Sequence, residues 1–110
     1  MGVTKSEIFS EHQNRLASVA RVLGHPARIA ILQEVIKRNS SICGDLVETI
    51  GLAQPTISQH LRELKNIGII KGNIEGTRVC YCIDPEKWKE IKNLFVEFMD
   101  QDIAIHNECC

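Results

Sequence analysis

Two short amphipathic segments stand on either side of Gly51, and a β-hairpin pattern follows them directly. Residues 42–50 form the first segment, and a glycine such as Gly51 is expected just after the end of a helix. Residues 54–66 form the second segment, with Pro55 placed where a first helical turn accepts proline. Its aliphatic stripe has helical spacing and consists of Ile57, Leu61 and Leu64. This order predicts two short helices that meet at a tight turn.

The opposite side of segment 54–66 consists of side chains that donate and accept hydrogen bonds. They are Thr56, Gln59, His60 and Glu63, flanked by Ser58 and Arg62. A helix that enters the major groove of DNA needs such a side, because base edges are read through hydrogen bonds. Gln59 suits a bidentate pair with adenine, whereas Arg62 and Lys65 suit phosphate.

Two strands are predicted next, at residues 69–72 and 78–83. Residues 73–77 join them through a turn that contains Gly76. In the second strand alternate side chains share a side, so Val79, Tyr81 and Ile83 are expected on one face and Cys80 and Cys82 on the other. Lys71 and Arg78 stand at the base of this hairpin, where they are expected to reach a neighbouring DNA backbone.

Helices are also predicted on both sides of this central region. The first runs over residues 5–23, where Thr4 and Glu7 have capping-box spacing, and the second opens at Pro26. The last runs over residues 85–103 after the N-cap Asp84. It carries a broad apolar face formed by Trp88, Ile91, Leu94, Phe95, Phe98 and Met99. A chain this short has little to cover that face, so we expect a second copy to do so.

The formal net charge of −1 hides a division along the chain. Residues 53–83 carry four basic and two acidic side chains, whereas residues 84–110 carry three basic and seven acidic ones. The middle is therefore suited to face a polyanion, and the C-terminal part is not. The length of 110 residues indicates one domain, and no apolar run is long enough to span a membrane.

Together the elements predict a mainly α fold with a small β-hairpin, a winged helix-turn-helix of order ααααββα in a homodimer. Residues 1–104 would form the DNA-binding and dimerisation domain, and residues 105–110 a cysteine-containing tail. The candidate DNA contacts are Gln54, Thr56, Ser58, Gln59, His60, Arg62, Lys65 and Arg78.

Several motifs resemble the ArsR/SmtB family of metal-responsive bacterial repressors. Residues 23–32, which read LGHPARIAIL, are similar to its signature, and residues 52–64 are similar to its recognition helix. Residues 68–70 and 76–81 resemble the turn and wing strand that follow that helix. The resemblance implies a homodimer on a palindromic operator, with the first and last helices at the dimer interface, and an inducer that releases the DNA.

Two positions depart from the family pattern. Ala53 stands where a serine N-cap is frequent, and residues 41–46 hold one cysteine where arsenic- and cadmium-type members often carry Cys-Val-Cys-Asp-Leu. Asp100, Asp102 and His106 also do not reproduce the zinc-type site of the last helix. A zinc-type sensor is therefore not expected.

The five cysteines are Cys43, Cys80, Cys82, Cys109 and Cys110. An odd number cannot be fully paired, and with no export signal we expect a reducing cytoplasm, where such a set indicates metal or redox chemistry. Cys43 would lie in the first turn of the helix at 42–50 as an activated thiolate, or else be a small core residue. The spacing of Cys80 and Cys82 fits chelation of one soft ion, or the two are small strand residues with no ligand. Cys109 and Cys110 either add ligands to such an ion or form a tail with no role.

Ligation by thiolates alone selects soft ions, so we interpret all five cysteines as candidate ligands of an inducer rather than of a cofactor. Arsenite is favoured because of the resemblance, and Sb(III), Cd(II) or Pb(II) would also fit. The alternative keeps the DNA binding and makes the cysteines a redox or persulfide sensor. An enzyme of thiol-transfer type is disfavoured because Cys-x-x-Cys and a glycine-rich phosphate loop are both missing from the sequence. A winged helix that serves only protein contacts would show no salt-dependent DNA affinity.

Overall fold

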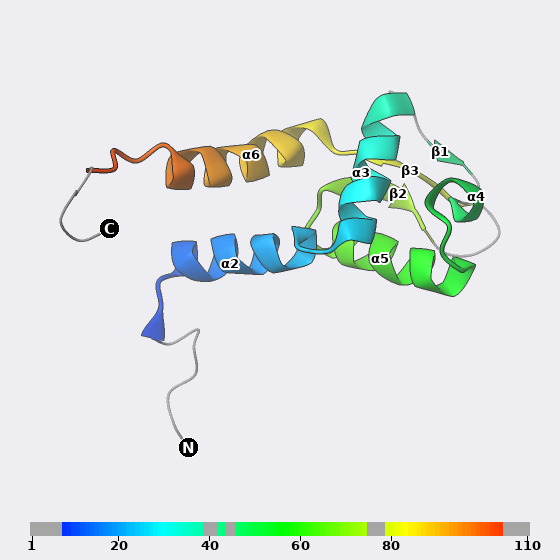
Figure 1. Cartoon of the computed structure of the whole chain (residues 1–110), viewed down its shortest axis with the longest axis horizontal. Helices are drawn as coiled ribbons and strands as arrows, with labels where there is room; N and C mark the ends of the chain where they lie inside the picture. Colours follow the sequence, from blue (N-terminus) through cyan, green and yellow to red (C-terminus); the bar gives the residue numbers. More distant parts are fainter. Residues whose placement is uncertain (1–7, 39–41, 44–45, 75–78, 105–110) are drawn as a thin grey trace, which may run out of the picture.

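The computed structural model describes residues 8–38, 42–43, 46–74 and 79–104 of the chain (Figure 1). Its elements are α2 (Glu11–Leu23), α3 (Pro26–Arg38), β1 (Ile42–Cys43), α4 (Val47–Ile50), α5 (Gln54–Asn66), β2 (Ile70–Asn73), β3 (Cys80–Ile83) and α6 (Pro85–Met99). The predicted winged helix-turn-helix order is confirmed, with one short strand added before α4. Within the described residues, no helix has the length and apolar character needed to cross a lipid bilayer.

The strands form one antiparallel sheet in the order β1-β3-β2. Tyr81 lies at its centre, opposite Ile42 on one side and Gly72 on the other. The prediction of a helix over residues 42–50 is therefore wrong at its start, since Ile42–Cys43 is a strand and the helix covers only Val47–Ile50. Ile42 is 2% exposed, so pairing with β3 and burial of this β-branched side chain outweigh the local helical pattern.

The start of α2 and the end of α6 differ from the sequence prediction. The N–H of Gln13 donates to Ser10 Oγ at 3.1 Å and the N–H of Ser10 donates to Gln13 Oε1 at 3.0 Å, a capping box that starts α2 at Glu11 rather than at Lys5. The box predicted at Thr4 and Glu7 lies outside the described residues. Asp84 caps α6 as predicted, but α6 ends at Met99 instead of Ile103.

The core lies where α2, α3 and α5 meet the sheet and the start of α6. The aliphatic stripe of α5 is buried as predicted, and Tyr81 is 1% exposed with Val79 and Ile83 packed beside it. Ile31 on α3 and Ile91 on α6 belong to the same cluster. These contacts fix α5 against the rest of the molecule through its apolar side.

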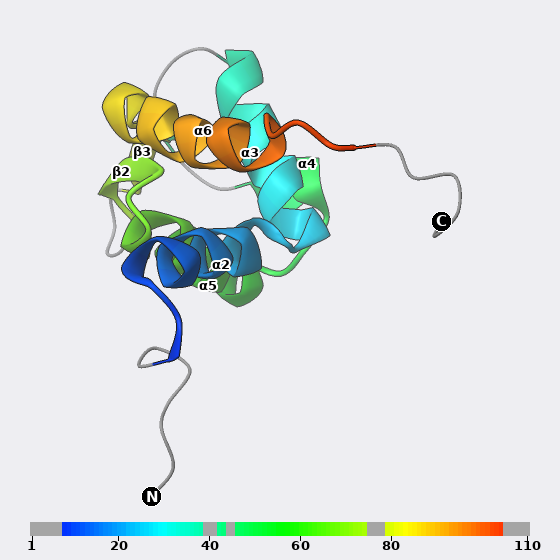
Figure 2. The same ribbon diagram turned by 90° about the vertical axis from the view of Figure 1, so that its left-hand side faces the viewer.

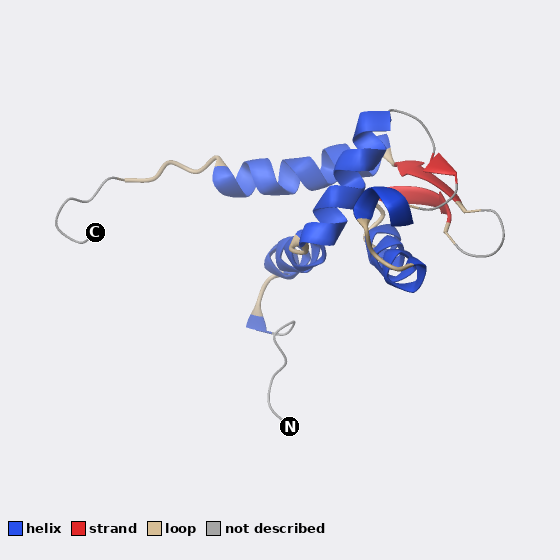
Figure 3. Cartoon of the chain, turned by 45° about the vertical axis from the view of Figure 1, so that its right-hand side comes forward, coloured by secondary structure: helices blue, strands red, loops and turns tan. Residues whose placement is uncertain are grey.

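Two helices extend from this body in the same direction, away from the sheet. In Figure 1, α2 and α6 run out to the left of the sheet, and Figure 2 shows one above the other. An ion pair links them, because Arg15 Nη2 lies 3.0 Å from Glu90 Oε2. Figure 3 shows the strands at the opposite end of the molecule, beside α5. The nucleic-acid candidates and the apolar face of α6 are thus separated in space.

Candidate nucleic-acid interface

A turn of three residues aims α5 away from α4. Gly51 has φ +85°, which L side chains adopt with strain, and apart from its chain neighbours no atom lies within 4 Å of where its Cβ would be. Ala53 is the N-cap and forms no side-chain cap bond, but its carbonyl accepts from Thr56 N–H and Ile57 N–H at 3.0 Å each. Pro55 lies in the first turn, where a backbone N–H has no partner within the helix, so the N–H that proline lacks is not missed. The backbone therefore starts α5 without the serine cap frequent in the family.

One side of α5 is open to solvent and carries polar side chains. Four predicted DNA contacts are exposed there: Gln54, Thr56, Gln59 and Lys65. Ser58 and Arg62 are half-buried beside them, and Gln54 Nε2 donates to Ser58 Oγ at 3.2 Å. The two-sided character of the helix is confirmed by burial, while contact of these side chains with DNA stays a prediction.

His60 lies on the inner side of α5, so the expectation that it shares the exposed side with Gln59 is wrong. Its residue is 7% exposed, and Arg28 Nε donates to its Nδ1 at 3.0 Å. The ring of His25 lies 4.4 Å from the ring of His60 at 57°. Burial lowers the pKa of His60 first, and the electrostatic effects of His25 and Arg28 lower it further against an opposing effect of Glu63. The neutral imidazole is therefore favoured at this position.

Basic side chains also border a hollow of about 450 Å³ between the end of α5 and β2. Its lining residues are Arg62, Lys65, Asn66, Asn73 and Ile74. Lys71 of β2 is exposed and lies two residues before Asn73, which lines the hollow. Arg78 lies outside the described residues. Amide and cationic groups around a hollow of this kind suit phosphate oxygens.

Three of the five candidate cysteines, Cys43, Cys80 and Cys82, lie in the described part of the chain. Cys43 lies in β1 rather than in a first helical turn, so the argument that a helix dipole activates it is wrong. Cys80 is disulfide-bonded, whereas Cys82 is a half-buried free thiol. Cys109 and Cys110 lie outside the described residues. Over the described ranges, no three His, Cys, Asp or Glu side chains come together as a metal site.

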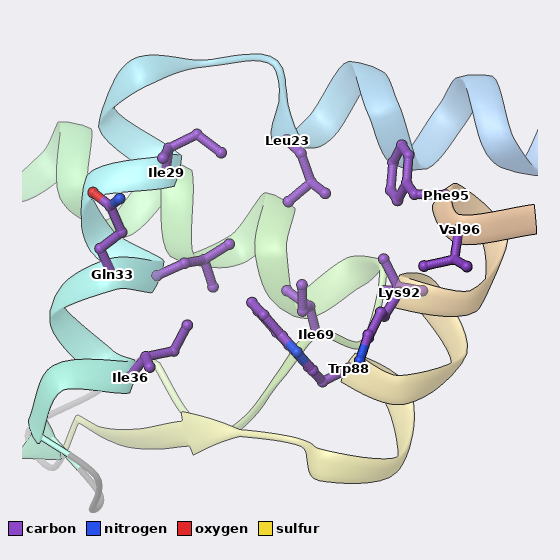
Figure 4. A pocket seen from close by; sticks show the side chains of 11 residues that line it. Leu23, Ile29, Gln33, Ile36, Ile69, Trp88, Lys92, Phe95 and Val96 are labelled. Atoms are coloured by element: carbon purple, nitrogen blue, oxygen red, sulfur yellow. The ribbon is translucent and has the colours of Figure 1, made fainter. Parts of the chain in front are cut away.

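An apolar groove that the sequence analysis missed lies between α3 and α6 (Figure 4). It has a volume of about 510 Å³, and Ile29 and Ile36 border it from α3, while Trp88 and Phe95 border it from α6. Each pair is seven residues apart, which is the spacing of a helical seam. That spacing is a sequence signal for an apolar seam on each helix, and the structure shows that the two seams face one groove.

Comparison with known proteins places these features in a family. Residues 25–71 match the model of "Bacterial regulatory protein, arsR family". An uncharacterized helix-turn-helix transcriptional regulator of Methanocaldococcus jannaschii is 34% identical over 87 residues, which are 79% of this chain and 98% of that protein. A probable mercury resistance operon repressor of Streptomyces lividans is 27% identical over 96% of this chain and 82% of its own length.

The fold is similar to a solved structure as well. The crystal structure of NolR from Sinorhizobium fredii superposes with a TM-score of 0.61 at 19% identity, covering 93% of this chain and 99% of that one. The match to the family model spans α3, α4 and α5, the segment that contains the buried stripe and the exposed polar side described above. The chain belongs to the arsR family of bacterial regulatory proteins and is a helix-turn-helix transcriptional regulator, not an enzyme.

Proposed function

We propose that this chain represses transcription by placing the exposed side of α5 in the major groove of an operator. The observation that carries the proposal is the division of α5. Ile57, Leu61 and Leu64 are at most 2% exposed, while Gln54, Thr56 and Gln59 are exposed. Amide and hydroxyl groups on an anchored helix can form paired hydrogen bonds with base edges. Such a regulator works where chromosomal DNA lies, in the cytoplasm.

We propose that the active form is a homodimer on a palindromic operator. The groove between α3 and α6 is apolar, and the exposed side chains of Phe98 and Met99 follow its lining residue Val96 on α6. Phe98 is 52% exposed and Met99 72%, which is costly for a monomer in water. A second copy related by a two-fold axis would cover the same face on both chains and present two α5 helices to two half-sites.

A titration of DNA by fluorescence anisotropy tests the operator proposal. The probe is a duplex selected from random sequence by the immobilised protein, in reducing buffer. We expect Lys65→Ala to weaken binding and to reduce the slope of log affinity against log salt by about 0.9, as expected for one lost phosphate contact. Lys89→Ala is the matched control, because Lys89 is an exposed lysine on α6. Equal effects of the two variants, or no selected sequence, would contradict the proposal.

For the release signal we propose a thiophilic metalloid, arsenite first. The support is chemical: the chain is rich in thiols, and the Streptomyces lividans relative is named for mercury, another thiophilic metal. A three-thiolate site does not form from the described residues alone, since they include no three-ligand group. The thiols of Cys43, Cys109 and Cys110 are the further ligands that would complete it.

The thiol-redox alternative is favoured by a separate observation. Cys80 is disulfide-bonded, and the residue opposite it in the β1–β3 ladder is Cys43. Oxidation of two thiols by hydrogen peroxide forms one disulfide and two water molecules. A polysulfide is the second candidate oxidant, and it converts a thiol to a persulfide.

One titration separates the two signals. Preformed protein–DNA complex receives arsenite in reducing buffer or peroxide without reductant. Release by arsenite that fails in the Cys80→Ser, Cys82→Ser variant supports metalloid binding at the wing. Release by peroxide alone supports the redox alternative, and release by neither removes both.

A further inference from the structure

One arginine ties three elements together around the buried histidine of α5. Arg28 lies on α3, and its Nε donates to His60 Nδ1 on α5 at 3.0 Å. Its Nη1 donates to the carbonyl oxygen of Val22, near the end of α2, at 3.0 Å. The guanidinium thus links the inner side of α5 to both helices on which it packs.

The histidine in this link has to be neutral at Nδ1. A guanidinium does not lose its proton in a protein, so Arg28 can only donate, and His60 Nδ1 has to offer a lone pair. Protonation of His60 would place an N–H against that donor and a second positive charge beside the first. The bond would then be replaced by repulsion at the contact between α3 and α5.

The groups facing His60 from each side determine how readily it takes up a proton. His25 lies against it from the connection between α2 and α3, and Arg28 faces it from α3. Glu63, on α5 itself, acts in the opposite direction. His25 Nδ1 accepts a hydrogen bond from the N–H of Ala27 at 3.1 Å, and this bond holds the His25 ring in place beside His60. Burial, His25 and Arg28 together hold the pKa of His60 below its usual value.

We propose that the Arg28–His60 hydrogen bond positions α5 for DNA and that protonation of His60 releases this hold, so that operator affinity falls in mildly acidic conditions. His60 acts in this role through α5 and does not touch the DNA, since its residue is 7% exposed. The inference rests on the proposed function, because it concerns how the same helix is presented.

Replacement by asparagine separates the hydrogen bond from the charge. In His60→Asn the side-chain oxygen occupies the place of Nδ1, accepts a hydrogen bond and does not titrate. In His60→Leu the acceptor is lost at every pH. His12→Asn is the matched control, since His12 is an exposed histidine on α2.

The experiment measures affinity for the selected duplex at pH 7.5 and pH 5.5 by fluorescence anisotropy, with circular dichroism at both values. We expect the parent and His12→Asn to lose at least about fivefold more affinity on acidification than His60→Asn does. His60→Leu should bind more weakly than His60→Asn at pH 7.5. NMR titration of the His60 ring should give a higher pKa in Arg28→Met than in the parent.

The outcomes distinguish this role from the proposed function itself. Specific binding by the parent at pH 7.5, together with the same pH profile in the parent and in His60→Asn, overturns the role of the pair and leaves the repressor proposal standing. An unchanged His60 titration in Arg28→Met also overturns the role. Failure of the parent to bind any selected duplex overturns the proposed function, and the positioning role falls with it.

Discussion

Replacing one residue on each side of α5 separates protein stability from DNA affinity. Leu64 is fully buried, at 0% exposure, whereas Gln59 is exposed on the other side of the same helix. Leu64→Ala leaves a cavity in the core and is expected to cost about 2–5 kcal/mol of unfolding free energy. Gln59→Ala removes no buried contact, so its cost should stay within about 0.5 kcal/mol.

These energies convert into shifts of the melting temperature. With about 2.1 cal/mol/K of unfolding entropy per residue, a chain of 110 residues has about 0.23 kcal/mol/K. Leu64→Ala should therefore lower the Tm by about 9–22 °C, and Gln59→Ala by no more than about 2 °C. Circular dichroism melts at one fixed protein concentration measure both, because an oligomer melts in a concentration-dependent way.

The effect on DNA affinity should be reversed. Loss of one bidentate base contact costs about 1–3 kcal/mol, so Gln59→Ala should bind the selected duplex about 5- to 150-fold more weakly. On duplex of scrambled sequence its affinity should be close to that of the parent. Leu64→Ala, assayed well below its Tm, should stay within a fewfold of the parent on both.

Two results would refute this reasoning about α5. A Tm loss in Gln59→Ala as large as that in Leu64→Ala would mean that the polar side of α5 is packed in the native assembly. Undiminished preference of Gln59→Ala for the selected duplex would mean that another surface reads the bases.

Three further predictions concern pH, the wing and the dimer. Because the pKa of His60 is lowered in the folded state, the stability that its neutral form provides is complete above about pH 6.5 and is lost as the pH falls from there towards the lowered pKa. The free energy of unfolding in urea should therefore fall with pH over this range in the parent, and should fall less in His60→Asn. Gly72→Ala should lower the free energy of unfolding more than Gly51→Ala does. Both glycines have positive φ, but a Cβ at Gly72 would clash with Cys80 O and Tyr81 Cα, whereas a Cβ at Gly51 would clash with no other segment. Chemical denaturation measures both losses of stability, and equal losses would contradict the steric reason. Phe98→Glu should give a smaller species in analytical ultracentrifugation, and an unchanged sedimentation coefficient would place the dimer contact elsewhere.

Local signals in the sequence predicted much of the fold. The stripe Ile57–Leu61–Leu64 is spaced as the backbone of any α-helix requires, and it is buried as predicted. Pro26, Pro55 and Asp84 mark helix starts through effects within one turn, and α3, α5 and α6 begin where they indicate. The exposed polar side of α5 follows from the same periodicity, which is why the exposure of Gln54, Thr56, Gln59 and Lys65 could be predicted without a structure.

Contacts between distant segments decided the rest. Ile42 joins a strand because Tyr81 lies opposite it. His60 is three residues after Ile57 and four before Leu64, so helical spacing places it on the inner side of α5. Its hydrogen-bond partner, Arg28, lies 32 residues earlier in the chain. The apolar groove needs α3 and α6 side by side, which neither helix specifies alone. Sequence periodicity thus determined which side of each helix is apolar, since that depends on backbone geometry within a few residues. The partners of Ile42, His60 and Trp88 were decided only by tertiary packing, because each depends on a segment far away in the chain.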